Sequence, residues 1–203
     1  MMVEDSYRRP AATFRTEHVV ARSRFIATIT LVESVEQARA FLTSIQNEMP
    51  DASHHVYAYV VGHGSSVIEG MSDAGEPSGS AGPPVMAVLR GSKLGDTLIV
   101  VTRYFGGTKL GVGGLVRAYS DAARAALLGV TIEERIPRVR LTVDATYALY
   151  ERIVRLVQSQ EGNIEATDFT ADVHLTLVLP LRNLDLFQSE LRELSAGRIQ
   201  AAV

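Results

Sequence analysis

Residues 95–121, GDTLIVVTRYFGGTKLGVGGLVRAYSD, constrain the fold of this chain more than any other stretch. Residues 98–101 form a short apolar run of the kind that fills a buried strand. Five of the nine residues from 106 to 114 are glycine, so the backbone there can adopt positive φ and approach another group closely. Residues 114–128 place apolar side chains on one stripe of a helix. The stretch therefore predicts a buried strand, a glycine-rich bend and an amphipathic helix.

Positive charges bracket this bend, and the start of a helix attracts anions through its free N–H groups and its dipole. We therefore expect a phosphate or carboxylate site here. Its expected binding residues are Arg103, Gly106, Gly107, Lys109, Gly111, Gly113, Gly114 and Arg117. The spacing matches neither the P-loop nor the dinucleotide-binding pattern. A structural interpretation stays equally open, in which the glycines let the helix and the strand pack closely.

Length and composition restrict the class of protein. A chain of 203 residues suits one large or two small domains. Cysteine is absent, which excludes disulfides, thiolate catalysis and cysteine metal sites. No apolar run is long enough to span a membrane, and the N-terminus lacks the apolar region of a secretory signal. These features predict a cytoplasmic protein without a membrane partner.

The charge balance argues against a generally basic nucleic-acid binder, because the net charge is −3. Residues 136–203 carry 7 arginines and 9 acids, so neither half of the chain is basic overall. Any contact with nucleic acid must therefore come from a local patch of positive charge.

Periodicity predicts an α+β fold in the upstream half. Strands are expected at 23–31, 55–61, 67–71 and 98–101, and helices at 35–49, 85–89 and 114–128. Ser34 and Gln37 have the spacing of a capping box for the first helix. Residues 1–16 are expected to be a loosely held tail, and residues 72–82 a surface loop.

A second pattern starts after a polar break at residues 133–137. Strands are expected at 139–143, 164–169, 173–179 and 199–203, with helices at 147–160 and 184–194. This β-α-β-β-α-β order is that of the ferredoxin-like unit. The sequence thus predicts two domains, residues 1–135 and residues 136–203.

Three polar residues of the upstream half are candidates for catalysis. His54, Asp73 and Glu76 could supply an acid–base group and the carboxylate that orients it. A histidine at a strand edge is more often structural, however, and Asp73 and Glu76 could simply cap turns. No metal site is expected, because the spacing matches no usual ligand pattern. Tyr104 and Phe105 are expected to lie in the core, since no basic stripe surrounds them.

Four segments resemble the YigZ/IMPACT family. They are SRFIATI (23–29), ASHHVYAYVVG (52–62), DAGEPSGSAGPP (73–84) and RYFGGTKLGVGGLVRAYSDA (103–122). The resemblance implies a first domain like the second domain of a small-subunit ribosomal protein. It also implies a ferredoxin-like second domain resembling the late domains of elongation factor G. One departure is Asp73-Ala74, where the family usually has two acids.

What the resemblance implies about function is a translation-linked regulatory or binding module. Its partner would be RNA, the ribosome or a protein of translation, and the cofactor stays unknown. Fold analogy alone is a weak basis for function. An alternative therefore stays open: an enzyme that acts in the first domain on a small molecule bearing a phosphate or a carboxylate.

Overall fold

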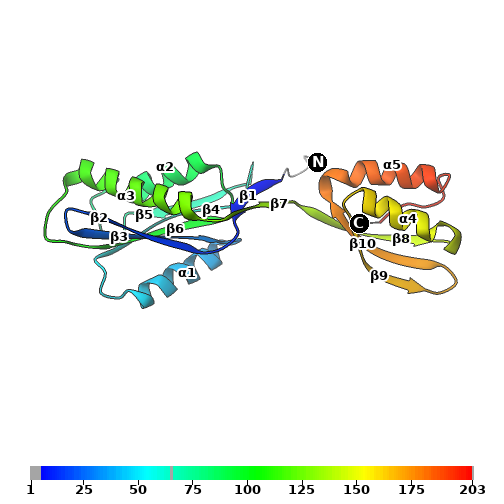
Figure 1. Ribbon diagram of the computed structural model, residues 1–203, viewed down its shortest axis with the longest axis horizontal. Coiled ribbons are helices and arrows are strands. Elements are labelled where there is room, and N and C mark those ends of the chain that lie inside the picture. Colours follow the sequence, from blue (N-terminus) through cyan, green and yellow to red (C-terminus); the bar gives the residue numbers. More distant parts are fainter. Residues whose placement is uncertain (1–5, 65, 203) are drawn as a thin grey trace. The chain divides into compact units, whose positions relative to one another are not determined.

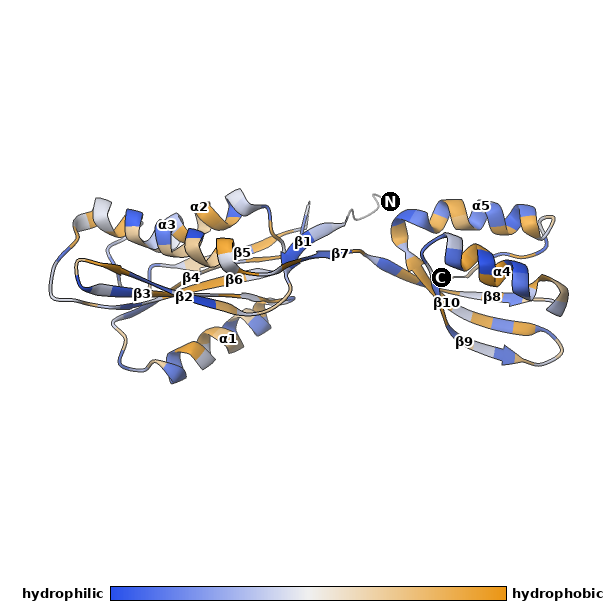
Figure 2. Ribbon diagram, in the orientation of Figure 1, coloured by the Kyte–Doolittle hydropathy of each residue, from blue (hydrophilic) through white to orange (hydrophobic). Residues whose placement is uncertain are grey.

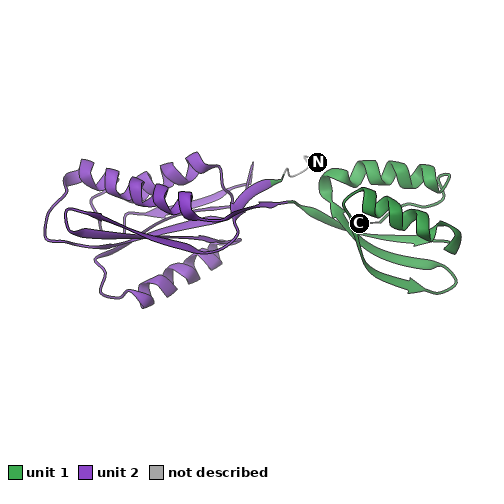
Figure 3. Ribbon diagram, viewed as in Figure 1, with its two compact units in different colours: residues 1–6, 136–203 green, residues 7–135 purple. Residues whose placement is uncertain are grey.

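The computed structural model describes residues 6–64 and 66–202, and it divides into two compact units. Tyr7–Arg135 form the N-terminal unit, drawn in purple in Figure 3, and the chain from Ile136 onward forms the C-terminal unit, drawn in green. Each unit has its own hydrophobic core. No helix of the described residues is long and apolar enough to cross a membrane.

The N-terminal unit is built on a five-stranded antiparallel sheet with strand order β2-β3-β6-β4-β5. Its strands are β2 (Phe14–Val20), β3 (Ser23–Leu31), β4 (His54–Val61), β5 (Ile68–Ser72) and β6 (Thr97–Tyr104). The central strand β6 is buried along nearly its whole length, as its apolar run predicts.

Helices cover both faces of this sheet (Figure 1). They are α1 (Val35–Glu48), α2 (Gly82–Ser92) and α3 (Gly111–Gly129). Helices α2 and α3 lie on one face and α1 lies on the other. The larger core lies under α2 and α3, and a smaller one lies under α1.

The helix starts follow the local sequence. The Ser34 side chain accepts the Gln37 N–H at 3.1 Å, so the predicted cap of α1 is confirmed. Helix α2 begins at Gly82 with prolines in its first turn, where a missing N–H costs nothing. Helix α3 begins at Gly111, three residues earlier than the apolar stripe predicts. The stripe misses this first turn because three of its four residues are glycines, which have no side chain to mark a helix face.

The prediction of a loose tail over residues 1–16 is wrong where the structure describes it. Strand β1 (Tyr7–Pro10) pairs antiparallel with β7 (Ile132–Arg135), which lies in the expected polar break. The register places Arg9 opposite Glu133, and their side chains meet at 2.8 Å. Backbone pairing and charge hold this two-stranded ribbon together. Its sequence therefore does not need the alternation of apolar residues by which a strand is predicted, and the prediction missed it.

The C-terminal unit packs two helices on one face of a three-stranded antiparallel sheet of order β8-β10-β9. Its elements are β8 (Arg138–Ala145), α4 (Tyr147–Ser159), β9 (Asn163–Phe169), β10 (Val173–Pro180), the 3-10 turn η1 (Leu181–Asn183) and α5 (Leu184–Leu194). In Figure 2 hydrophobic and hydrophilic residues alternate along α4 and α5, as expected of helices with one buried face.

The expected last strand, 199–203, is not formed over the described residues. A single antiparallel bridge joins Thr142 and Ala202 beside β8, and Val203 lies outside the described residues. A segment this short could not show by its pattern alone that, of the described residues 199–202, only Ala202 pairs. The two units together confirm the α+β class.

Candidate functional site

A buried carboxylate, Glu76, lies at the centre of the polar residues of the N-terminal unit. Its Oε1 accepts a hydrogen bond from Arg103 Nη1 at 2.7 Å and another from the Tyr119 hydroxyl at 2.7 Å. The Glu76 and Arg103 side chains are only 3% and 6% exposed. Burial and the neighbouring carboxylate raise the pKa of Tyr119, so this hydroxyl stays a donor. The three groups form a neutralised, hydrogen-bonded network.

Strand register explains how Arg103 reaches this network. Arg103 lies on β6 between Phe25 of β3 and His54 of β4. Its guanidinium lies over the Phe25 ring at 5.4 Å and donates to the Ser23 hydroxyl at 3.4 Å. Among the described residues its buried Nε has no hydrogen-bond partner. Arg103 is therefore largely committed to contacts within the chain.

The two adjacent histidines of β4 have different partners. His54 Nδ1 lies 2.9 Å from the carbonyl oxygen of Ala74, which can only accept, so the proton is on Nδ1. Its Nε2 then faces Glu76 Oε1 at 3.8 Å, and the side chain is 24% exposed. His55 contacts Thr102 on the opposite face of the sheet, where burial lowers its pKa. Only His54 belongs to the cluster.

Asp73 ties the segment that carries Glu76 to the start of α2. Its carboxylate accepts three backbone N–H groups at 2.8–2.9 Å, from Gly79, Ala81 and Gly82. Burial acts to raise the pKa of Asp73, but these three donors together hold it below the usual value. The structure thus gives Asp73 the turn-capping contacts that the sequence left open as an alternative to catalysis.

The positions of the bend differ in whether, and why, the structure requires glycine there. A Cβ at Gly106 would lie 2.1 Å from the backbone of Arg22, so two chain segments touch there. Gly107 and Gly111 have positive φ, 87° and 70°. At Gly114 a Cβ would come within 3.0 Å of Leu110. Gly113 has neither a positive φ nor a neighbour within 4 Å, so no residue that the structure describes requires glycine there.

Three side chains around the bend face outward. Lys109 and Arg117 are exposed, and no ion pair or hydrogen bond joins either to another described residue. Phe105 is 50% exposed, which makes its expected place in the core wrong, whereas Tyr104 does pack against the core under α1. The sequence does hold a signal for Phe105, because it follows the end of a strand and precedes two glycines.

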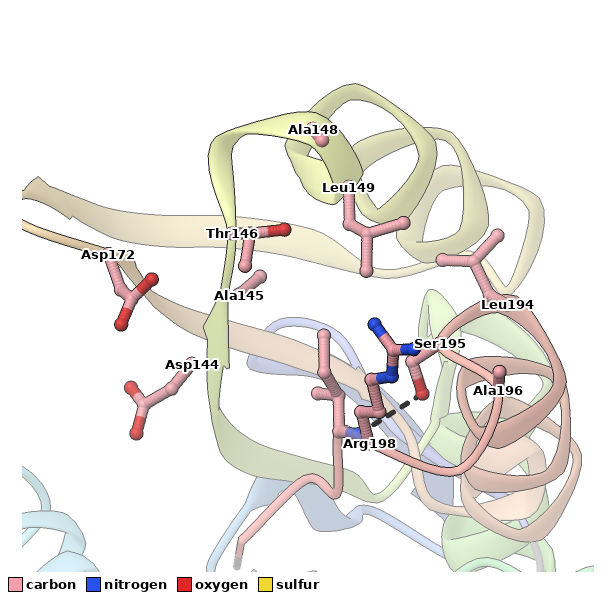
Figure 4. Close-up of a pocket in the computed structure, with 11 residues that line it drawn as sticks. Asp144, Ala145, Thr146, Ala148, Leu149, Asp172, Leu194, Ser195, Ala196 and Arg198 are labelled. Carbon is pink, nitrogen blue, oxygen red and sulfur yellow. Dashed lines mark hydrogen bonds between the residues drawn. The ribbon is translucent and has the colours of Figure 1, made fainter.

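The C-terminal unit has a cavity of about 490 Å³ between the start of α4 and the end of α5. In Figure 4 the Arg198 guanidinium lies near Leu149 and Leu194, and the carboxylates of Asp144 and Asp172 lie apart from it. Asp144 is joined to His174 at 2.5 Å. The sequence predicted no site here, and the cavity carries mixed charge around apolar walls. No group of three His, Asp or Glu residues suited to a metal occurs in residues 6–64 and 66–202.

Comparison with known proteins matches both units. Residues 21–127 match the Impact N-terminal domain, and residues 143–198 match a domain of unknown function, DUF1949. An IMPACT family member of Haemophilus influenzae is 38% identical over 194 residues, 95% of this chain and 94% of that protein. The IMPACT family member YigZ of Escherichia coli is 37% identical, covering 97% of each chain.

A solved structure agrees with these matches along the chain. It is described as the crystal structure of a hypothetical protein, and it superposes with a TM-score of 0.71 at 37% identity. The superposition covers 99% of this chain and 98% of that one. The predicted resemblance is thereby confirmed, and the chain belongs to the IMPACT family.

Proposed function

We propose that this protein is a translation-linked binding module whose N-terminal unit binds RNA of the ribosome at the glycine-rich bend. The family resemblance supports it, since it implies a first domain like one of a ribosomal protein and a second like those of elongation factor G. The α+β fold of both units is compatible with that implication. The bend is the part of the unit whose chemistry suits a polyanion.

The observation that carries the proposal is the pair of exposed cations Lys109 and Arg117. Residues 103–120 contain three basic residues and no acid. Arg103 is committed to Glu76, which leaves Lys109 and Arg117 available for phosphates. Salt-dependent attraction to a phosphate backbone needs such a local patch and no overall positive charge.

The C-terminal unit offers a less favourable surface. Asp144 and Asp168 of its sheet and Asp172 of the turn before β10 act on His174, and this negative charge raises the pKa of His174, mainly through the hydrogen bond that Asp144 accepts from it. Phosphates would be repelled there. This supports placing the proposed RNA site in the N-terminal unit.

The test compares two arginines of α3. Arg117 has no ionic partner among the described residues, whereas Arg124 is paired with Asp121 at 2.7 Å and is the matched control. We expect Arg117→Ala to weaken binding to a fluorescently labelled ribosomal RNA fragment, and Arg124→Ala to leave it nearly unchanged. Equal effects of the two variants, or no binding by the wild type, would contradict the proposal.

A second candidate function is supported by the orientation of His54. Since Nδ1 donates its proton in a hydrogen bond to the Ala74 carbonyl, Nε2 of this partly exposed ring is free to accept a proton. Glu76 lies 3.8 Å away and could stabilise the imidazolium that forms. This arrangement would suit an enzyme acting on a phosphate or carboxylate ester.

A panel of phosphate and carboxylate esters tests this candidate. If His54 is the base, His54→Gln abolishes turnover of the active ester while the melting temperature stays close to that of the wild type. The neighbouring His55→Gln, on the opposite face of the sheet, is the control. Turnover that survives His54→Gln removes the histidine from the mechanism.

A further inference from the structure

Phe105 is a large aromatic side chain held in place at the surface. The residue is 50% exposed, although burying its ring would be favourable. Its backbone N–H donates to the Ser53 hydroxyl at 3.2 Å. The ring lies over the guanidinium of Arg103, 5.5 Å from the ring centroid. Since Arg103 is itself fixed by Glu76, the ring is supported from beneath by a buried residue.

The backbone that follows this ring in the chain carries few side chains. Gly107 and Gly111 follow within six residues, and a Cβ on either would meet nothing within 4 Å. Gly113 lies in the first turn of α3, where alanine would be favoured by up to about 1 kcal/mol. Because no contact within the chain requires Gly113, its absence of a side chain points to close approach by a partner from outside.

The charges that follow the ring in the chain select the partner. Lys109 lies four residues beyond Phe105, and no acid occurs between residues 103 and 120. An exposed ring that is followed in the chain by a cation and by glycines is suited to an unpaired base and its phosphates. A duplex would hide its bases in the stack and leave the ring without a partner, and an acidic peptide would use the cations but not the ring.

We propose that Phe105 is the stacking platform for an unpaired base of single-stranded RNA, whose adjoining phosphates approach Lys109 and the backbone at Gly113. This inference rests on the proposed function and names its ligand as single-stranded RNA. Arg103 is a positioning residue, which holds the ring at the surface while remaining neutralised by Glu76.

A tryptophan placed at position 105 reports on stacking directly, because the chain contains no tryptophan. We expect the fluorescence of Phe105→Trp to be quenched by a single-stranded oligouridylate and far less by an RNA duplex of equal length. The control is Phe169→Trp, which places the probe at a similarly exposed site of the C-terminal unit. Its fluorescence should not change with either RNA.

Affinity provides the second measurement. Phe105→Leu should weaken binding to the single strand about tenfold and leave the duplex affinity unchanged, because base stacking is lost while the charges remain. If Phe105→Leu binds both RNAs as the wild type does, stacking is wrong and the proposed RNA function stands. If the wild type binds neither RNA, both proposals are wrong. Quenching by an acidic peptide but not by RNA would replace RNA with a protein partner.

Discussion

The Glu76 carboxylate and the Arg103 guanidinium meet at 2.7 Å, and both side chains are almost completely removed from water. One residue comes from the loop between β5 and α2, and the other from the end of β6. The Tyr119 hydroxyl of α3 completes the contact. The pair therefore joins three parts of the N-terminal unit directly beneath the proposed RNA site.

Removing one member of this pair should strongly destabilise the unit. Glu76→Gln leaves the buried Arg103 charge without its partner, so we expect a loss of about 3–5 kcal/mol in the free energy of unfolding, measured in urea. Asp121→Asn, which breaks the exposed pair with Arg124, should cost less than about 1 kcal/mol. Similar costs for the two variants would show that Glu76 and Arg103 are not buried together.

Two glycines of the bend should respond to alanine with opposite signs. Gly111 has φ of 70°, so Gly111→Ala should destabilise the N-terminal unit by about 1–2 kcal/mol. Gly113 has no such constraint, and Gly113→Ala should raise the melting temperature by improving the helix. The same Gly113→Ala protein should bind single-stranded RNA more weakly. Higher stability with unchanged binding would remove Gly113 from the site.

Asp73 should make the stability of the N-terminal unit depend on acid pH. Its pKa is lower in the folded than in the unfolded chain, so its contribution is present above about pH 4 and is lost as the pH falls through the folded value. Asp73→Ala should cost about 2 kcal/mol at pH 7 and progressively less below pH 4. Urea unfolding of both proteins at several pH values measures this. A cost that stays constant down to pH 2 would contradict the three hydrogen bonds.

His174 should titrate above the usual histidine range. The hydrogen bond with Asp144 raises its pKa, with smaller contributions from Asp168 and Asp172. Any stability that this pair gives the C-terminal unit is present at pH 6 and is lost as the pH rises through the folded pKa. Proton NMR of the imidazole should show a pKa that falls back toward the usual value in Asp144→Asn. No change in that variant would show that the contact does not persist in solution.

The sequence predicts elements that have an apolar period and misses those that do not. Strand β6 follows from its apolar run, helix α1 from its period and its capping box, and the hairpin of β9 and β10 from its alternation. The ribbon of β1 and β7 does not, because its pairing relies on backbone bonds and on charges such as Arg9 and Glu133. Pairing between segments so far apart leaves no local pattern.

The sequence predicts which residues belong to the candidate site, but it does not predict the contacts between them. The sequence marks His54, Asp73, Glu76 and Arg103 as candidates, because a hydrophobic core has no need of such polar residues. The sequence could not show that Arg103 turns to Glu76, nor that Tyr119, one residue of an apolar helix stripe, donates to the same carboxylate. A tyrosine in place of phenylalanine on such a stripe was the available signal, since a buried hydroxyl requires a partner.

The most direct test of the central claim is the salt dependence of binding to a single-stranded RNA. If Lys109 and Arg117 contact phosphates, the logarithm of the association constant should fall linearly with the logarithm of salt concentration. Replacing both residues with alanine should then reduce that slope by about 1.4, from roughly 0.7 for each lost phosphate contact. A slope that is unchanged in the double variant, or binding that does not depend on salt, would contradict RNA binding at the glycine-rich bend.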